Sequence, residues 1–477
     1  MSQSNSQIKV LSLNSRRGLK YVSKDRQPRI QAIAEVLSTL DYDLVCLQEL
    51  WVHADFQLIR NRVSKTLPYA KFFFSGALGS GLAILTRFPI VETSIRPYSL
   101  NGSPLDVAGG DFFVGKSIVS AVVEHPLLGE CEVFNTHMYA RGGDDGEESN
   151  RAHRIVGAWQ FGNLIRASAR RGRYVIATGD FNSIPSTLPI TIVRSHGGLV
   201  DAWMASHDSS LFPTETVFSP QLAVRDYGIT CDSPLNTYSA GKPLSDVAKR
   251  FQGKRLDYVF YRQPQTPPAS SARSTSSSSP SWELFCVKSE VVLTGLVPGR
   301  PFSYSDHFGL EAILEIRHSR PVARSPPLTM DGFGVTTGLE ASTASLRSSS
   351  AIPLEDFCAA ELSSHSLSAA LNALGIAYRR ARRKSTMELA GFGAVLLVAI
   401  CLVAGSAWQP RSEFNPIMVF VAVALGWAGT TLLYSGFIHG NYEVNMLVNA
   451  IEEMEMLRAQ RSDRASSSDS RTSSPRR

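Results

Sequence analysis

Acidic and amide residues stand at the ends of several short apolar segments that have the length and composition of buried strands. Asn14 closes the first segment, Glu49 follows the apolar residues 45–48, and Asp180 and Asn182 follow a third segment. Carboxylate and amide oxygens are hard ligands that suit Mg²⁺, which keeps several waters and binds few protein groups. The pattern therefore indicates metal-assisted chemistry at the ends of strands.

Two more motifs later in the chain also place polar residues at the end of an expected strand. Asp257 begins an apolar run, and the triplet Ser305-Asp306-His307 precedes the last expected strand. Each piece alone has an ordinary explanation, because an Asp in a Gly-Asp turn is usually a turn residue and Glu49 could be a carboxylate at a helix N-terminus. All of these pieces in one order are hard to explain as coincidence.

The elements that must hold these residues belong to one α/β region. Short apolar runs predict strands at residues 8–13, 43–48, 81–86, 117–123, 131–135, 174–178, 257–261, 290–293 and 309–316. Helical spacing of apolar residues predicts helices over 26–40 and 150–168. Adjacent short strands mixed with helices predict a layered sheet sandwich flanked by helices.

Two uncharged apolar segments lie near the C-terminus, at residues 389–408 and 416–438. About 20 helical residues cover the roughly 30 Å hydrocarbon core of a bilayer, so each segment is long enough to span it. The gap between them, QPRSEFN, is short enough only for a turn, and a transmembrane hairpin follows. A buried core hairpin is the alternative, but Gly426 and Gly429 suit helix packing in a membrane.

Basic residues flank this hairpin on the side of both chain ends. The cluster before the first span comprises Arg379, Arg380, Arg382, Arg383 and Lys384. Such flanks predict cytosolic termini and a cytosolic catalytic domain. Two short membrane helices suit the endoplasmic reticulum or the mitochondrial outer membrane. The cluster could also bind anionic headgroups as an activator site, or serve as a topology signal only.

Composition sets limits on the remaining segments. The net charge of +6 is too small to indicate a nucleic-acid partner, no protein partner is implied, and the six scattered cysteines are expected to be reduced thiols. The N-terminus shows no signal peptide. The domain expectations are a catalytic domain at 8–317 with a disordered insertion at 263–281, a linker at 318–352, a helical basic juxtamembrane region at 353–388, transmembrane helices at 389–408 and 416–438, and a cytosolic tail at 439–477 with a disordered end.

Residues 110–117 (GDFFVGKS) match the pattern of a phosphate-binding P-loop. A true P-loop follows a buried strand and opens a helix whose N-terminus faces the phosphates. Here the upstream stretch is polar and turn-like, and the downstream stretch (SIVSAVVEH) is β-branched and predicts a strand. Nucleotide hydrolysis is therefore not expected.

The motifs LSLN, CLQE, GDFN, LDYVF and SDH together resemble the endonuclease/exonuclease/phosphatase superfamily, which uses a two-sheet α/β sandwich. Within it, the chain is more similar to neutral sphingomyelinases and the fungal inositol phosphosphingolipid phospholipases C. Supporting stretches are GLKY at 18–21, NTH at 135–137 and AHR at 152–154. The resemblance covers about residues 8–316 and extends to the C-terminal two-helix anchor.

The resemblance implies a role for each site residue. Glu49 binds Mg²⁺, with Asn14 helping directly or through water, and His307 is the general base. The other implied roles are orientation of the base by Asp257, positioning of water and phosphate by Asp180 and Asn182, stabilisation of the phosphorane or the departing oxygen by His137, and support of the metal or the loop by Asp306.

The P-loop-like segment carries an Asp and a Lys in the resembling phospholipases, where they are implicated in lipid recognition. The matching residues are Asp111 and Lys116. Lys116 could contact the substrate phosphate or an activating anionic lipid, and a surface turn with a charged Lys is the plainer alternative. The resemblance implies a Mg²⁺-dependent phospholipase C that cleaves a phosphosphingolipid in the bilayer. Alternatives are a nuclease or inositol-polyphosphate phosphatase of the same superfamily, a membrane-bound P-loop switch, and a catalytically dead scaffold.

Overall fold

The computed structural model describes residues 6–15, 25–107, 109–142, 148–207, 213, 215–265, 282–318 and 361–472. Strands of the first sheet are β1 (Gln7–Asn14), β2 (Leu44–Gln48), β3 (Tyr69–Phe73), β4 (Leu82–Thr86), β11 (Trp282–Val292) and β12 (Gly309–His318). Strands of the second are β5 (Ile90–Pro97), β6 (Ser117–His125), β7 (Gly129–His137), β8 (Tyr174–Asp180), β9 (Val200–Asp201) and β10 (Asp257–Arg262). Among the described residues the orders are β11-β12-β1-β2-β4-β3 and β5-β6-β7-β8-β10-β9.

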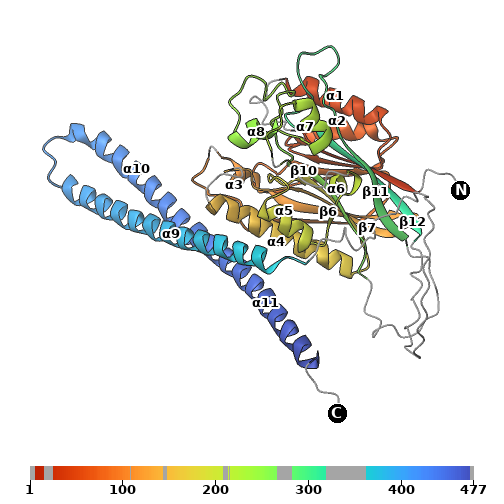
Figure 1. Cartoon of the computed structure of the whole chain (residues 1–477). Helices are drawn as coiled ribbons and strands as arrows, with labels where there is room; N and C mark the ends of the chain where they lie inside the picture. The colour runs from red at the N-terminus through yellow and green to blue at the C-terminus, as the bar shows by residue number, and fades with distance from the viewer. Residues whose placement is uncertain are drawn as a thin grey trace, which may run out of the picture.

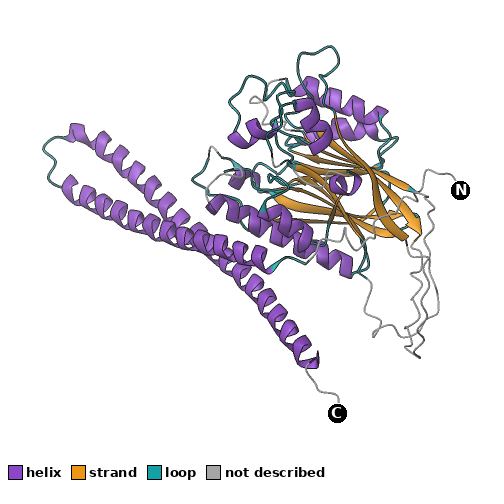
Figure 2. Cartoon of the chain, in the orientation of Figure 1, coloured by secondary structure: helices purple, strands orange, loops and turns teal. Residues whose placement is uncertain are grey.

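The two sheets face one another, and helices cover their outer faces (Figure 2). One apolar cluster joins the inner faces and includes Val10, Cys46, Val133 and Ile176. On the outside of the first sheet lie α1 (Arg26–Thr39) and α2 (His53–Val63), and on the outside of the second lie α4 (Glu148–Arg170) and α5 (Leu188–Ser195). Shorter helices are α3 (Asp111–Val114), α6 (Ala202–Ser206), α7 (Pro220–Tyr227) and α8 (Asp246–Phe251). The sandwich and its flanking helices confirm the predicted fold class.

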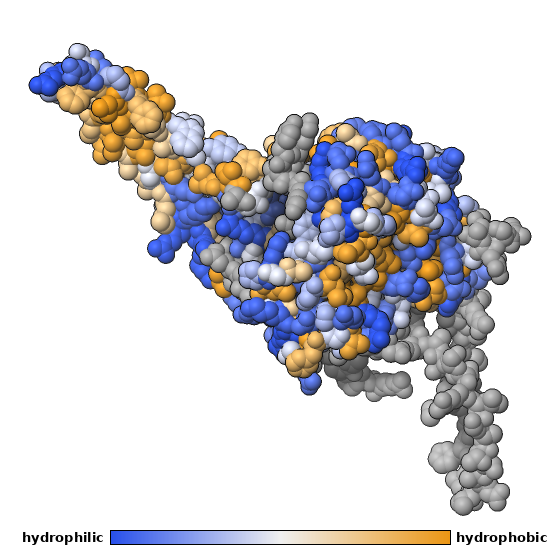
Figure 3. Space-filling model, turned by 90° about the horizontal axis from the view of Figure 1, so that it is seen from above, coloured by the Kyte–Doolittle hydropathy of each residue, from blue (hydrophilic) through white to orange (hydrophobic). Residues whose placement is uncertain are grey.

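A long helical hairpin projects from this sandwich (Figure 1). Its first arm is α9 (Ser364–Ser406), and after the short η3 (Ser412–Phe414) the chain returns through α10 (Asn415–Leu433), the π-helix η4 (Tyr434–His439) and α11 (Gly440–Thr472). The projecting part is apolar with a hydrophilic tip (Figure 3). In the first arm 0% of the most apolar stretch is buried inside the protein, and in the second arm 6% of it is. Both arms are long and apolar enough to cross a membrane.

The base of the hairpin packs against the catalytic sandwich. Leu367 and Leu374 of α9 are buried in the same apolar cluster as Trp159 of α4. The indole Nε1 of Trp159 also donates a 2.6 Å hydrogen bond to Glu453 of α11. The hairpin is therefore attached to the sandwich by side-chain packing as well as by the chain itself.

Several segments differ from or fall outside the sequence expectations. The helix α9 runs without a break from the basic region at 379–384 into the first apolar span. The helix α11 continues to Thr472, past Ser462, where the sequence predicts disorder. Most of the expected insertion (266–281) and of the expected linker (319–352) lies outside the described residues.

Candidate active site

Sheet register brings the predicted site residues to one end of the sandwich. The strands β1 and β2 are parallel, so Asn14 pairs with Gln48 and Glu49 follows directly. In the other sheet, β7 and β8 are parallel, and His137 pairs with Asp180. Since parallel strands end at the same edge of a sheet, all of these residues meet there.

Two antiparallel strands complete the site from the opposite direction. The first residue of β10, Asp257, pairs with Asp180, the last residue of β8. The segment with His307 immediately precedes β12, which is antiparallel to β1. The site is thus assembled from strand ends of both sheets.

Asp180 lies at the centre of the site, 1% exposed. Its Oδ2 accepts a 2.9 Å hydrogen bond from the Asn14 amide, and its Oδ1 accepts one of 2.9 Å from the backbone N–H of Asn182. Burial, together with the nearby charge of Asp257, raises the pKa of Asp180 to about 7, although His307 and Lys116 act in the opposite direction. A buried carboxyl with a pKa near neutrality typically belongs to a functional site.

His307 and Asp257 form a hydrogen-bonded pair on one side of Asp180. The ring Nδ1 lies 2.7 Å from Asp257 Oδ2, and Nε2 lies 3.9 Å from Asp180 Oδ2. Burial lowers the pKa of His307, whereas the charges of Cys231 and Asp257 together raise it well above 6.5. Because burial raises the pKa of the Cys231 thiol to about 12, that thiol is neutral near pH 7. The carboxylate of Asp257 is therefore the charge that raises the pKa of His307.

The loop that carries His307 is held by Ser305. Its hydroxyl donates to the Asn14 carbonyl at 2.7 Å and contacts Asp306 Oδ1 at 3.2 Å. The Ser305 carbonyl in turn accepts from Asn236 Nδ2 at 2.9 Å. Asp306, 5% exposed, therefore lies beside the contacts that hold the His307 loop.

Lys116 and His137 form a second pair on the other side of Asp180. The ammonium of Lys116 lies 2.7 Å from His137 Nε2 and donates to the Met138 carbonyl at 3.0 Å. The ring Nε2 is also 3.4 Å from Asp180 Oδ2. Burial, the charge of Lys116 and the charge of His307 hold the pKa of His137 well below 6.5, so the ring is neutral. An ammonium can only donate, which makes Nε2 the acceptor.

The P-loop-like segment contributes Lys116 to this second pair and lacks the strand-loop-helix arrangement of a P-loop. The residues after Lys116 form strand β6, as predicted, and the preceding helix α3 has four residues. Asp111 of α3 forms a 3.2 Å ion pair with Lys116. Both side chains are nearly buried, at 10% and 4% exposure, so the alternative of a surface turn for Lys116 is wrong.

Glu49 stands at the more open edge of the site, with 19% of its side chain exposed. Its Oε1 lies 3.5 Å from Asn14 Nδ2 and 3.8 Å from His137 Nε2. Its backbone has φ 56°, a left-handed conformation that packs it closely on Gly81. A side chain at Gly81 would approach the backbone of Leu50 to 2.5 Å, so only glycine fits there.

Two groups of residues are suited to holding a divalent metal ion. Glu49 supplies an open carboxylate, and the Asn14 amide lies 3.5 Å from it while donating to Asp180. Asp180, Asp257 and His307 have ligand atoms within 4.8 Å of one another. Since His307 and Asp257 already bind each other, the carboxylate of Glu49 is the better match to a hard cation that keeps its waters, and Asn14 is placed to contact such a cation through a water.

Asn182 is fixed just beyond the last residue of β8. It adopts a left-handed backbone with φ 48°, and its Nδ2 donates to the Met138 carbonyl at 2.9 Å. The same carbonyl accepts from Lys116, so Asn182 and Lys116 are connected through one backbone oxygen. Strain of this kind at a non-glycine residue is typical of functional positions.

A fully buried pair that sequence reasoning missed connects the two sheets below the site. Gln48 Nε2 donates to Asn135 Oδ1 at 2.8 Å, and Asn135 Nδ2 donates to the carbonyls of Leu47 and Ala83 at 2.9 and 3.0 Å. These contacts fix the end of β2 and therefore Glu49. Both residues lie inside motifs already noted, beside Glu49 and His137, and polar residues within apolar strands were the available signal.

Comparison with known proteins agrees with this geometry. The chain is 34% identical over 457 residues to the inositol phosphosphingolipids phospholipase C of Schizosaccharomyces pombe, which covers 94% of both chains. It is 32% identical over 334 residues to the protein of the same name from Saccharomyces cerevisiae, covering 65% of this chain and 64% of that one. It is 28% identical over 456 residues to human sphingomyelin phosphodiesterase 2, covering 94% and 90%. A model of the endonuclease/exonuclease/phosphatase family matches residues 11–307, and the chain belongs to that family.

Proposed function

We propose that this protein is a Mg²⁺-dependent phosphodiesterase that hydrolyses a phosphosphingolipid by phospholipase C chemistry. The products are ceramide and a phosphorylated headgroup. The observation that carries the proposal is the buried Asp180 between two polar pairs, His307 with Asp257 and Lys116 with His137. The relatives named above, which cover most of the chain, supply the substrate class.

In this proposal His307 is the general base. Its Nδ1 is held by Asp257, which leaves Nε2 to take a proton from water as the water oxygen attacks phosphorus. Asp257 fixes the ring orientation and stabilises the imidazolium that forms. Asp180 and Asn182 position the water and the phosphate oxygens.

Charge that develops on the phosphate is met from the other side of the site. The Lys116 ammonium, oriented by Asp111 and by the neutral His137 that accepts from it, is placed to bind a phosphate oxygen. Through this ammonium His137 stabilises the phosphorane or the departing ceramide oxygen. Glu49 and Asn14 would hold Mg²⁺, which supplies Lewis-acid stabilisation of the phosphate charge when bound. Asp306 supports the loop of the base.

A substrate panel tests this function. The purified full chain, with Mg²⁺ and anionic lipid, is offered inositol-phosphoceramide, sphingomyelin, phosphatidylcholine and abasic DNA side by side, with Asp180→Ala as the inactive control. Release of ceramide by the native chain and not by the control supports the proposal. Cleavage of DNA alone would favour the nuclease alternative, and retained turnover in Asp180→Ala would refute the assigned site. Loss of ceramide release on chelation, with recovery on adding Mg²⁺, tests the metal.

We further propose that the hairpin spans the membrane with both termini and the catalytic domain in the cytosol, in the endoplasmic reticulum or the mitochondrial outer membrane. The support is the pair of exposed apolar arms and the basic residues at their base. A chain that ends before Leu389 should leave the membrane fraction, and retention in a salt-washed pellet would contradict the anchor.

Anionic phospholipid is the proposed activator, bound through the exposed part of α9 before the first span. Arg379, Arg380, Arg382 and Arg383 are exposed and Lys384 is half-buried there. Each cation near an anionic surface contributes about 1 kcal/mol. Lys116, predicted with them as an activator contact, is enclosed by Asp111 and His137, so we assign it to the substrate phosphate instead.

A further inference from the structure

Polar contacts tie the two arms of the hairpin together where the first apolar span begins. Ser435 Oγ donates to Glu388 at 2.8 Å, and Ser385 Oγ donates to the Gly436 carbonyl at 2.7 Å. Just beside them, Met387 is 63% exposed. Hydrogen-bonded polar groups followed by exposed apolar side chains mark the level at which the arms pass into the bilayer.

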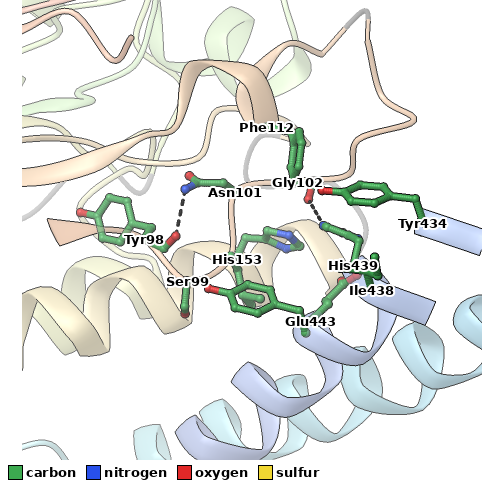
Figure 4. Close-up of a pocket in the computed structure, with 12 residues that line it drawn as sticks. Tyr98, Ser99, Asn101, Gly102, Phe112, His153, Tyr434, Ile438, His439 and Glu443 are labelled. Carbon is green, nitrogen blue, oxygen red and sulfur yellow. Dashed lines mark hydrogen bonds between the residues drawn. The ribbon is translucent and has the colours of Figure 1, made fainter. Parts of the chain in front are cut away.

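A loop of the catalytic domain is held against the hairpin close to this level. The Gly102 carbonyl lies 3.0 Å from His439 Nε2, and Lys384 Nζ donates to Ser103 Oγ at 3.1 Å (Figure 4 shows the first contact). Lys384 precedes Leu389 by five residues, about 7.5 Å along a helix. The loop therefore begins within about one and a half helical turns of the first apolar span.

The next residues of this loop expose apolar side chains. Leu105 is 45% exposed and Val107 is 71% exposed. Between them, Asp106 turns back, forming an ion pair with Arg141 and accepting a 3.1 Å hydrogen bond from the Gly109 backbone. The charge of the loop is thus paired within the protein, and its outward side chains are apolar.

The surroundings of the loop match an interfacial membrane contact. A cavity of about 530 Å³ beside Leu105 is lined by the basic side chains of Arg141, Arg380 and Lys384 and by the acidic side chains of Asp106 and Glu443. Apolar side chains next to Lys and Arg are the composition of segments that lie in the headgroup layer. A single exposed apolar residue on a soluble surface carries no such meaning.

The aromatic pair that follows in sequence is engaged elsewhere. The ring of Phe112 packs against His439 with centroids 5.4 Å apart, and the Phe113 carbonyl accepts from the backbone of Ala77 and Leu78 (Figure 4 shows Phe112). Both aromatic residues are half-buried, and Phe112 contacts the hairpin. Leu105 and Val107 are the side chains that this loop leaves for a partner.

We propose that the loop at 102–107 is a third membrane contact, in which Leu105 and Val107 enter the interfacial layer of the bilayer. The inference rests on the proposed insertion of the hairpin. The loop leads directly into α3, so the contact links the lipid surface to Asp111 and Lys116. Figure 1 shows α3 on the side of the sandwich toward which the hairpin projects. The contact would hold the active-site end over the lipid from which substrate is taken.

Site-directed fluorescence in vesicles tests the contact with the full chain. In a Cys358→Ser, Cys401→Ser background, an environment-sensitive dye is placed at Val107→Cys, with Val91→Cys, 56% exposed at the far end of β5, as the matched control. The other thiols should stay unlabelled, because burial raises the pKa of Cys46, Cys131, Cys231 and Cys286 to about 12. The vesicles contain phosphatidylcholine and phosphatidylserine, with iodide as aqueous quencher and spin-labelled lipid as membrane quencher.

The proposal expects the dye at 107 to lose iodide quenching and to gain quenching by a shallow spin label, while the dye at 91 stays open to iodide. Equal iodide quenching at both positions would overturn it. Protection at 107 that depends on protein density, with energy transfer between labelled copies, would also overturn it, because a second copy would then cover the loop. Dye on native Cys401 separately reports the hairpin, since failure of deep quenching there refutes the anchor itself.

An activity assay gives a second readout. Leu105→Ser combined with Val107→Ser should lower hydrolysis of vesicle substrate about tenfold, which corresponds to losing two partly buried apolar side chains. Hydrolysis of a soluble short-chain substrate should be unchanged, as should both activities of Val91→Ser. An equal loss on both substrates would show damage to the fold and would contradict a lipid-specific role.

Discussion

The two histidines of the active site lie on opposite sides of one carboxyl group and have opposite electrostatic surroundings. His307 is paired with the carboxylate of Asp257, which favours the imidazolium. His137 is paired with the ammonium of Lys116, and burial together with that charge keeps its ring neutral. Both rings lie within 4 Å of Asp180, at 3.9 and 3.4 Å.

The difference between the two pairs is the basis of the roles that we propose for them. A ring stabilised in its protonated form is suited to receive a proton, so we propose that the His307 side activates water. A neutral ring with a fixed cation is suited to a negatively charged group, so we propose that the Lys116 side receives the phosphate. Substitutions on either side should therefore differ in kind as well as in size.

The largest effect is expected from His307→Ala. Removing the general base should lower kcat about 10⁴-fold, with little change in the apparent affinity for vesicle substrate. His318→Ala, at the other end of β12, is the matched control and should keep full activity. Near-normal turnover in His307→Ala would refute the assignment of His307 as general base, because the two histidine pairs would then not differ in proton transfer.

Lys116→Ala should have the next largest effect, a loss of about 10³-fold in kcat/KM. The reason is the loss of a fixed cation for the phosphate, and the protein should still fold, as circular dichroism would show. Lys71→Ala, on the exposed part of β3, serves as its control. Unchanged lipid hydrolysis in Lys116→Ala would refute the proposal that Lys116 binds the substrate phosphate.

Asp257→Asn should lower the rate about 10²-fold and also change its pH dependence. The base acts when neutral, so the native rate rises with pH through the raised pKa of His307. Without the Asp257 charge, that pKa falls and the acidic limb of the kcat/KM profile moves to lower pH. The exposed Asp246→Asn is the control, and an acidic limb that stays in place would show that Asp257 does not set the charge of the base.

Asp111→Asn should have the smallest effect, about tenfold in kcat/KM. The Lys116 ammonium would lose one of its partners but keep the Met138 carbonyl, so it would be oriented less well. Combining it with Lys116→Ala should add almost nothing, because both act through one group. Fully additive losses measured in this double-mutant cycle would separate Asp111 from Lys116.

Much of the His307 side could be predicted from sequence, and less of the Lys116 side. Strand ends with Asn14, Asp180 and Asp257 are local features, and the strand pattern alone places such residues at one edge. The contact between Lys116 and His137 depends instead on how α3 packs against residues 75–80, where a side chain on Gly115 would come within 2.6 Å of the Gly76 backbone. That close packing has no local signature.

The relation between the sandwich and the hairpin was also hidden from the sequence. Apolar length predicts the two spans, but the contact of Trp159 with Glu453 joins residues 294 positions apart. Strands β3 and β5 were not predicted either, because β3 carries Lys71 and β5 carries Glu92 and Arg96, which weaken the apolar pattern of these sheet-edge strands.

The unbroken course of α9, from its packing on α4 to the apolar span, has a consequence for how substrate reaches the enzyme. With the hairpin inserted as we propose, this continuous helix would keep the active-site end from turning toward a neighbouring membrane. The enzyme would then act only on lipids of its own leaflet that reach it by lateral diffusion. Its turnover should then follow the surface fraction of substrate in that leaflet and be indifferent to the number of substrate-bearing vesicles added from outside.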